Sequence, residues 1–353
     1  MEIKDFHYDL PQDLIGQKPT EPRDACKLIV LDREKENISH HIFKDILDLL
    51  NEKCVLVLND TKVFPARLVG KKTTGGKAEV LLLRQIESDT YMAIGKGGLK
   101  AGQEIIFSDR LKAKIQAKNF DGDLRIQFNV AGAELFRALD ESGHTPLPPY
   151  IHSSDPESVL RQEYQTVYAD IRGSAAAPTA GLHFTDQLLM DLKTKGVEVE
   201  KITLHVGLGT FRPVTDEQIQ SHKLHTENFT INEETATRLN QAKKDGKKII
   251  AVGTTSCRVL ESQATEEGLI ASGSGDTNIF IQPGYKYKFV DGLITNFHLP
   301  ETSLLMLVSA LCCSPNTKKE FTTFLDTLVG KAYLEAIKNE YKFFSFGDAM
   351  LII

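Results

Sequence analysis

The chain has 353 residues, of which 41% are hydrophobic and 25% are charged. These proportions are typical of a globular protein and exclude an intrinsically disordered one, and the length predicts two or three domains. A net charge of -6 excludes a protein that coats nucleic acid through a uniformly basic surface.

The amino terminus and the apolar runs predict a cytoplasmic protein. Residues 1–7 carry charges where a signal peptide has its apolar segment. No stretch approaches the roughly 20 apolar residues that cross a bilayer, and the longest, residues 304–313, is expected to be a buried helix. The five cysteines lack Cys-x-x-Cys spacing, which indicates reduced thiols in the core; a catalytic Cys257 is the alternative.

The first 65 residues contain strand and helix segments of an α/β fold. Residues 26–31 and 55–58 are apolar runs of strand length, and apolar side chains recur at helical spacing over residues 43–50. The second strand ends in the polar residues 59–61. Polar residues in this position are typical of functional sites in α/β folds.

From Ala66 the pattern changes to short alternating strands separated by turn residues, with no helical period between them. The six segments are residues 67–69, 78–83, 90–94, 104–107, 112–117 and 124–128. A helix over 132–142 then leads out of this region. The pattern predicts a small β-barrel of residues 66–145, inserted into an α/β domain formed by residues 1–65 and 146–353.

The predicted insert is basic although the whole chain is acidic. Residues 66–131 hold 12 Lys or Arg against 7 Asp or Glu, and the rest of the chain holds 30 against 41. Either this excess is a chance property of a solvated face, or it serves contacts with phosphate groups. In the second case the candidate RNA contacts are Arg67, Lys112, Lys114 and Lys118.

After Pro178, helices and strands alternate, which predicts a layered α/β domain with a largely parallel sheet. Thr185 and Asn232 have the side chains and positions of helix N-caps. Strands are predicted over residues 197–206 and 248–252, each after one of these helices.

Five polar segments, most of them rich in glycine or small residues, fall at the expected strand ends: residues 173–185, 205–213, 222–227, 252–261 and 293–300. Backbone N–H groups at a strand-to-helix turn can hold a carboxylate or a phosphate. Taken singly, each segment is also compatible with a structural turn or with a buried, hydrogen-bonded histidine.

His222, His225 and Glu227 are residue types that bind first-row metals. Their spacing differs from the helical His-Glu-x-x-His pattern, and on a strand the two histidines point in opposite directions. We therefore expect hydrogen bonding or acid–base chemistry here and no metal.

Six segments in order resemble the S-adenosylmethionine:tRNA ribosyltransferase-isomerases of queuosine biosynthesis. They are residues 178–185, 205–211, 222–227, 252–255, 295–300 and 344–350, and the similarity extends to residues 59–67. One small departure is Glu301-Thr302-Ser303, where a serine before the threonine is expected.

The resemblance implies an α/β domain with an inserted barrel, and an enzyme that uses S-adenosylmethionine as ribosyl donor without a metal. Such enzymes transfer and isomerise the ribosyl group onto the aminomethyl group of a 7-deazaguanine at the tRNA wobble position. The product is epoxyqueuosine, and adenine and methionine leave. The implied partner is tRNA, and neither a membrane nor an obligate protein partner is expected.

The resemblance also directs attention to particular side chains. A base beside the sulfonium group can start the rearrangement by removing a proton, and a helix start or an arginine can hold the methionine carboxylate. His298 and His205 are the first candidates for proton transfer, followed by His183, His225 and Glu227. The candidates for binding S-adenosylmethionine are Gly253, Thr254, Thr255, Arg258, Thr179, Gly181 and Asn296.

Two other classes of function compete with this one. An S-adenosylmethionine-dependent RNA methyltransferase is disfavoured because no Rossmann-type glycine loop is followed by an acidic residue at the next strand end. A non-catalytic RNA-binding protein is disfavoured because the polar side chains gather at strand ends and not over one broad basic surface.

Overall fold

Nine strands form the central sheet in the computed structural model, which describes residues 1–119, 122–207, 218 and 223–353. The strands are β1 Lys27–Asp32, β2 Asn37–Ile42, β3 Cys54–Asn59, β12 Glu198–Leu204, β13 Lys223–Ile231, β14 Lys248–Val252, β15 Gly273–Ile279, β16 Gly292–Asn296 and β17 Ala349–Ile352. Their order across the sheet is β15-β13-β12-β3-β14-β16-β17-β1-β2.

The prediction of a largely parallel sheet is correct for four of the eight pairs of neighbouring strands. Strands β12, β3, β14 and β16 are parallel, as are β17 and β1. The pairs β16–β17, β1–β2, β12–β13 and β13–β15 are antiparallel. For β1 and β2 the reason is the short turn of residues 33–36 between them, since parallel neighbours need a long crossover.

Helices cover both faces of this sheet. One face carries α6 Glu233–Lys244, α7 Gly253–Gln263, α8 Ser303–Leu311 and α9 Leu328–Lys338, and the other carries α1 Ile46–Leu49 and α4 Asp186–Thr194. The predicted caps are confirmed: the Thr185 hydroxyl accepts a hydrogen bond from the Leu188 N–H, and the Asn232 side chain accepts one from the Thr235 N–H.

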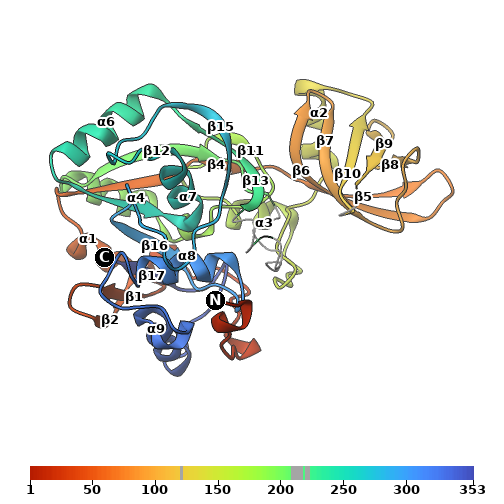
Figure 1. Cartoon of the computed structure of the whole chain (residues 1–353). Coiled ribbons are helices and arrows are strands. Elements are labelled where there is room, and N and C mark those ends of the chain that lie inside the picture. The colour runs from red at the N-terminus through yellow and green to blue at the C-terminus, as the bar shows by residue number, and fades with distance from the viewer. Residues whose placement is uncertain (120–121, 208–217, 219–222) are drawn as a thin grey trace.

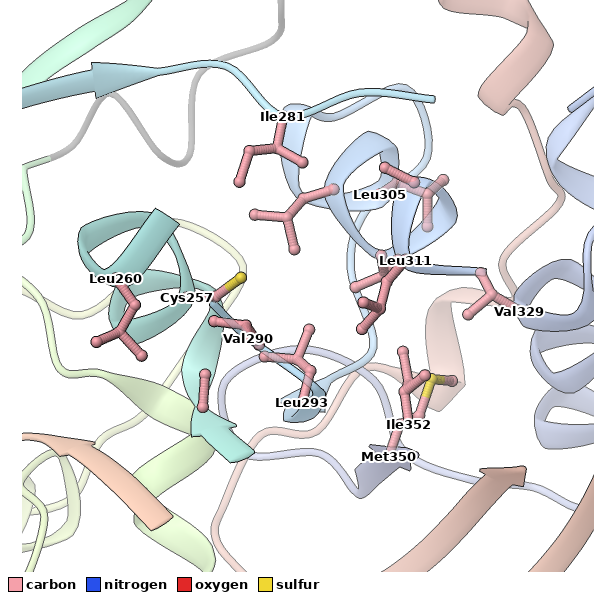
Figure 2. Close-up of a cluster of buried hydrophobic side chains, with 14 of the residues drawn as sticks. Cys257, Leu260, Ile281, Val290, Leu293, Leu305, Leu311, Val329, Met350 and Ile352 are labelled. Atoms are coloured by element: carbon pink, nitrogen blue, oxygen red, sulfur yellow. The ribbon is translucent and has the colours of Figure 1, made fainter. Parts of the chain in front are cut away.

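Strand alternation divides the core into two layers. In β3, Val55 and Val57 pack on the side of α6–α9, and Leu56 and Leu58 pack on the opposite side. Figure 2 shows part of the first layer, where Leu293 and Ile352 of the sheet lie with Cys257 of α7 and Leu311 of α8. All five cysteines are free and buried, as predicted.

Six strands close into a barrel beside the main domain, and all six were predicted (Figure 1). They are β5 Arg67–Lys72, β6 Lys77–Glu87, β7 Thr90–Lys96, β8 Glu104–Ile106, β9 Lys112–Lys118 and β10 Leu124–Phe128, followed by α2 Gly132–Ser142. Inward side chains such as Val80, Ile115 and Ile126 form a separate core. The predicted fold class, a layered α/β domain with an inserted small β-barrel, is confirmed.

The chain enters and leaves the barrel at adjacent positions. Arg67 and His144 form an isolated antiparallel bridge, with N–H to carbonyl distances of 3.2 and 2.8 Å. Nearby, β4 Thr61–Val63 pairs with β11 Ile171–Ser174, and α3 Glu157–Glu163 lies between the barrel and β11 in sequence.

The remaining elements are short 3-10 helices: η1 Ile3–Phe6, η2 Gln12–Leu14, η3 Arg23–Ala25, η4 Phe43–Asp45, η5 Thr179–His183 and η7 Phe324–Asp326. Of the helices within the described ranges, none has the length and apolar character needed to cross a membrane.

Candidate functional site

A cavity lies at the carboxyl ends of β14 and β16, where residues after both strands line it. Its empty volume, part of which is open to solvent, is about 670 Å³. The walls come from residues 177–180, 206, 253–255, 295–299 and 344–345, together with Tyr150, Thr302 and Leu304. Segments far apart in the sequence, including four of the five polar strand-end segments, therefore meet in one place.

The first turn of α7 forms one wall of the cavity. Gly253, Thr254 and Thr255 line it, and Gly253 has φ +87°, a conformation that residues with a Cβ rarely adopt. The first N–H groups of a helix lack partners within the helix and favour an anion. The buried Thr255 hydroxyl also has no hydrogen-bond partner among the described residues.

Asn296 ends β16 and also lines the cavity. Its Nδ2 donates to the Phe344 carbonyl at 2.9 Å and lies 3.1 Å from Nε2 of His183. His183 Nδ1 in turn lies 3.2 Å from Sγ of Cys26. Burial lowers the pKa of His183 to about 4, so that its imidazole is neutral near pH 7.

His298 lines the same cavity, two residues beyond Asn296. Its Nε2 lies 2.9 Å from the Thr295 hydroxyl, and its backbone N–H donates to the Tyr333 hydroxyl at 2.8 Å. Tyr8 donates to its carbonyl oxygen. Burial lowers the pKa of His298 to about 3, which makes it a neutral and weakly basic imidazole.

His205 follows β12 and approaches a different group. Its Nδ1 lies 2.8 Å from the Thr61 hydroxyl, at the polar end of β3 that the sequence singled out. A Cβ at Gly173 would lie 2.6 Å from the His205 ring, so the close approach of this ring requires glycine. Burial lowers the pKa of His205.

Arg258 lies further along α7 and forms a buried ion pair with Glu227 of β13. The Gly207 N–H also donates to Glu227, at 3.2 Å. Arg258 is not among the described residues that line the cavity. The ion pair therefore connects α7 and β13 to the segment of Val206, which does line it.

The structure places the other candidates around this cavity in different ways. Thr179 lines it, whereas Gly181 is buried against Tyr168 and His225 is exposed on β13. His222 lies outside the described residues. Within the described ranges, no group of three His, Cys, Asp or Glu side chains is arranged to hold a metal ion.

The candidate RNA contacts lie on the barrel. Lys114 and Lys118 are exposed and Lys112 is partly exposed on β9. Alternation places Lys112 and Lys114 on one outward face. A register shift precedes Lys118, which lies opposite the buried Leu124 and donates from Nζ to the Leu99 carbonyl. In Figure 1 this strand is on the side of the barrel away from the nine-stranded sheet. Arg67 faces the other way: it pairs with Glu79 at 2.9 Å and lines a cleft between the barrel and residues 144–160.

Tyr150 and Ser345 line the cavity but were not among the predicted site residues. The Tyr150 hydroxyl lies 2.7 Å from that of Ser345, and its ring lies 4.9 Å from the ring of Phe344. Phe344 has φ +70°, unusual for a bulky residue and often found at functional sites. Residues 344–350 were among the segments that carried the family resemblance, whereas Tyr150, which follows two prolines, was not indicated by the sequence.

Comparisons with known proteins show which proteins this chain is similar to. The family described as "Queuosine biosynthesis protein" matches residues 3–352. Proteins of Clostridioides difficile (strain 630) and Acetivibrio thermocellus, both named S-adenosylmethionine:tRNA ribosyltransferase-isomerase, are 49% and 50% identical over 100% of both chains. A crystal structure of S-adenosylmethionine tRNA ribosyltransferase from Thermotoga maritima is 33% identical, with a TM-score of 0.54, over 99% of this chain and 100% of the other.

Proposed function

Because the chain belongs to the queuosine biosynthesis protein family, we propose the reaction that its full-length relatives are named for. The protein is a transferase and isomerase that uses S-adenosylmethionine to modify tRNA. It moves the ribosyl group of S-adenosylmethionine onto 7-aminomethyl-7-deazaguanine at the wobble position and isomerises it. Epoxyqueuosine-tRNA, adenine and methionine are the products.

The observation that carries the assignment of the site is the meeting of four polar strand-end segments at one cavity. Its residues fit S-adenosylmethionine, because Thr255 and Asn296 bring buried polar atoms that lack partners among the described residues, and the start of α7 favours a carboxylate. Thr179, Gly253 and Thr254 add further polar groups to the wall. When bound, S-adenosylmethionine supplies the sulfonium-activated ribosyl group.

We assign proton transfer to His298 and His205. Each is neutral near pH 7, the form that can accept a proton, and burial makes both weaker bases than a free imidazole because it lowers their pKa values. His298 lines the cavity directly. His205 is held by Thr61 and lies one residue from Val206, which lines the cavity.

The remaining candidates are proposed to act at a distance from the reacting atoms. Arg258 and Glu227 hold the segment of Gly207 in place, and Gly181 lets η5 pack against Tyr168. His183 orients Asn296. His225, exposed on β13, is proposed to contribute from the same strand as Glu227.

The tRNA is proposed to span both parts of the chain. We propose that residues 66–145 form a domain of their own, inserted between residues 1–65 and 146–353, and that Arg67, Lys112, Lys114 and Lys118 of this insert contact RNA phosphates. We place the protein in the cytoplasm, where tRNA is available, and no obligate protein partner is required by this proposal.

The test is release of adenine from S-adenosylmethionine, followed by chromatography. Release is expected with an anticodon stem-loop that carries the 7-aminomethyl-7-deazaguanine, and not with the same stem-loop carrying guanine. A methyltransferase would instead give S-adenosylhomocysteine and retain adenine, and that product would overturn the proposal. A protein that only binds RNA would give neither product.

A further inference from the structure

The amide of Asn296 is held in one orientation. Its Nδ2 donates to the Phe344 carbonyl, and a carbonyl oxygen can only accept. The reversed amide would place Oδ1 against that carbonyl, so Nδ2 must stay on this side. Oδ1 is therefore directed elsewhere, and this atom is buried without a hydrogen-bond partner among the residues that the structure describes.

His183 and Cys26 support this orientation from behind. Because Nδ2 of Asn296 is a donor, His183 Nε2 accepts from it and the imidazole proton lies on Nδ1, next to the Cys26 sulfur. Burial raises the pKa of the Cys26 thiol and lowers that of His183, so both groups are neutral. The three side chains form a relay without charge that fixes where Oδ1 points.

An unpaired buried carbonyl oxygen calls for a hydrogen-bond donor from a ligand, since leaving it unpaired is unfavourable. Such a donor is present at three places in S-adenosylmethionine: the α-ammonium group, the adenine amine and the ribose hydroxyls. The neighbourhood of Asn296 distinguishes between them.

Asn296 lies beside the start of α7. Strands β14 and β16 are parallel, with Val252 opposite Ile294. Gly253 is one residue beyond Val252, and Asn296 is two residues beyond Ile294, so both lie at the same end of the two strands. The N–H groups of the first helical turn favour an anion. A site for an anion and an acceptor for a donor group are thus next to each other, and only the α-amino acid end carries a carboxylate and an ammonium group on one carbon.

We infer that the α-amino acid end of S-adenosylmethionine binds between Asn296 and the first turn of α7, with Asn296 Oδ1 accepting a hydrogen bond from the α-ammonium group. The inference rests on the proposed use of S-adenosylmethionine. Thr255 lies in the first turn of α7 and lines the cavity, and its buried hydroxyl also lacks a partner among the described residues. His183 and Cys26 are positioning residues that act through Asn296.

The test compares ligands on the full-length protein by calorimetry, with an unreactive guanine-containing stem-loop present. In the wild type, an analogue with a keto oxygen in place of the α-ammonium group is expected to bind about 10- to 100-fold more weakly than S-adenosylmethionine, as for a lost charged hydrogen bond. Equal affinity of the two ligands would overturn the inference. This comparison needs no variant to fold.

Variants then locate the contact. Asn296→Ala is expected to bind the two ligands with similar affinity, whereas the matched variant Asn339→Ala, at an exposed position, should keep the wild-type ratio. If Asn296→Ala keeps that ratio but abolishes discrimination against the analogue with an oxo group in place of the adenine amine, Asn296 contacts adenine and the inference is wrong.

The relay has its own readout. His183→Leu is expected to lower the preference for S-adenosylmethionine over the keto analogue, and His183→Gln to restore part of it. A purely structural role for His183 would change thermal stability and leave the ligand ratio unchanged, which would overturn its assignment as a positioning residue. Adenine release by the wild type tests the proposed reaction separately, because binding ratios do not depend on turnover.

Discussion

The guanidinium group of Arg258 and the carboxylate of Glu227 form an ion pair in which each side chain is only 4% exposed. The pair joins α7 to β13, and Glu227 also accepts the Gly207 N–H. It therefore links the helix that begins at the cavity to the segment of Val206, which also lines the cavity. We therefore expect the loss of this ion pair to change the stability and the shape of the site.

Arg258→Met should lower the free energy of unfolding by about 3–5 kcal/mol, because it removes the cation from a buried carboxylate. The double variant Glu227→Met, Arg258→Met should be more stable than this single variant, since it removes both charges. Urea denaturation measures both effects. If the loss in the double variant equals the sum of the losses in Arg258→Met and Glu227→Met, the two side chains do not couple.

Stability should fall as the pH is lowered below about 6.5, the ordinary pKa of histidine in an unfolded chain. Burial lowers the pKa of His183 to about 4 and of His298 to about 3, so the unfolded chain binds more protons than the folded one below pH 6.5. The contribution of these two histidines to the free energy of unfolding is complete above about pH 6.5, and it is lost as the pH falls toward their pKa values in the folded protein.

Urea denaturation between about pH 7 and pH 4.5 checks this effect, with His183→Gln as the comparison. The variant should have a flatter pH profile than the wild type. The buried carboxyls of Asp60 and Asp348, whose pKa values burial raises, act in the opposite direction but are common to both proteins. Parallel profiles would contradict the assignment of a neutral buried His183.

Gly173→Ala should displace the His205 imidazole from Thr61, because the new Cβ would lie 2.6 Å from the ring. We expect a stability loss of about 1–3 kcal/mol from overpacking, and a lower kcat for adenine release. Gly76→Ala in the barrel is the matched control and should leave kcat unchanged, since its Cβ would approach only the flexible side chain of Lys72, at 3.0 Å. Unchanged kcat in Gly173→Ala would argue against a role for His205.

Reversing Lys112, Lys114 and Lys118 to glutamate should weaken binding of an anticodon stem-loop by about tenfold or more and reduce its salt dependence, because phosphate contacts release counterions. Fluorescence anisotropy at several salt concentrations measures both. Reversal of Lys193, Lys244 and Lys338, exposed lysines of the main domain, makes the same change in net charge and should have little effect. Similar losses in the two triple variants would remove β9 as an RNA contact.

The sequence predicted local structure better than it predicted long-range pairing. Turn residues between alternating runs indicated all six barrel strands, because the period of a strand and its flanking turns are local properties. Strand β17 pairs with β16 in the antiparallel direction although more than 50 residues separate them. No local sequence pattern encodes the direction of such a pairing.

The same limit applies to the site. Polar residues at strand ends indicated Asn296 and His298, because the topology of a parallel sheet brings such ends together. Whether a histidine lines a cavity or lies behind it depends on packing: His183 and His298 have similar local surroundings in sequence, but only His298 reaches the wall. Tyr150 reaches the cavity from the segment after the barrel, and its separation in sequence from the other lining residues gives no sign of this.

The bridge between Arg67 and His144 has a consequence for the architecture of the whole chain. Because the barrel is entered and left at neighbouring points, a linker of a few residues from position 65 to position 145 would leave the order of the nine-stranded sheet unbroken. We therefore expect the barrel to be removable: a protein without it would keep every described residue that lines the cavity and would lose Lys112, Lys114 and Lys118.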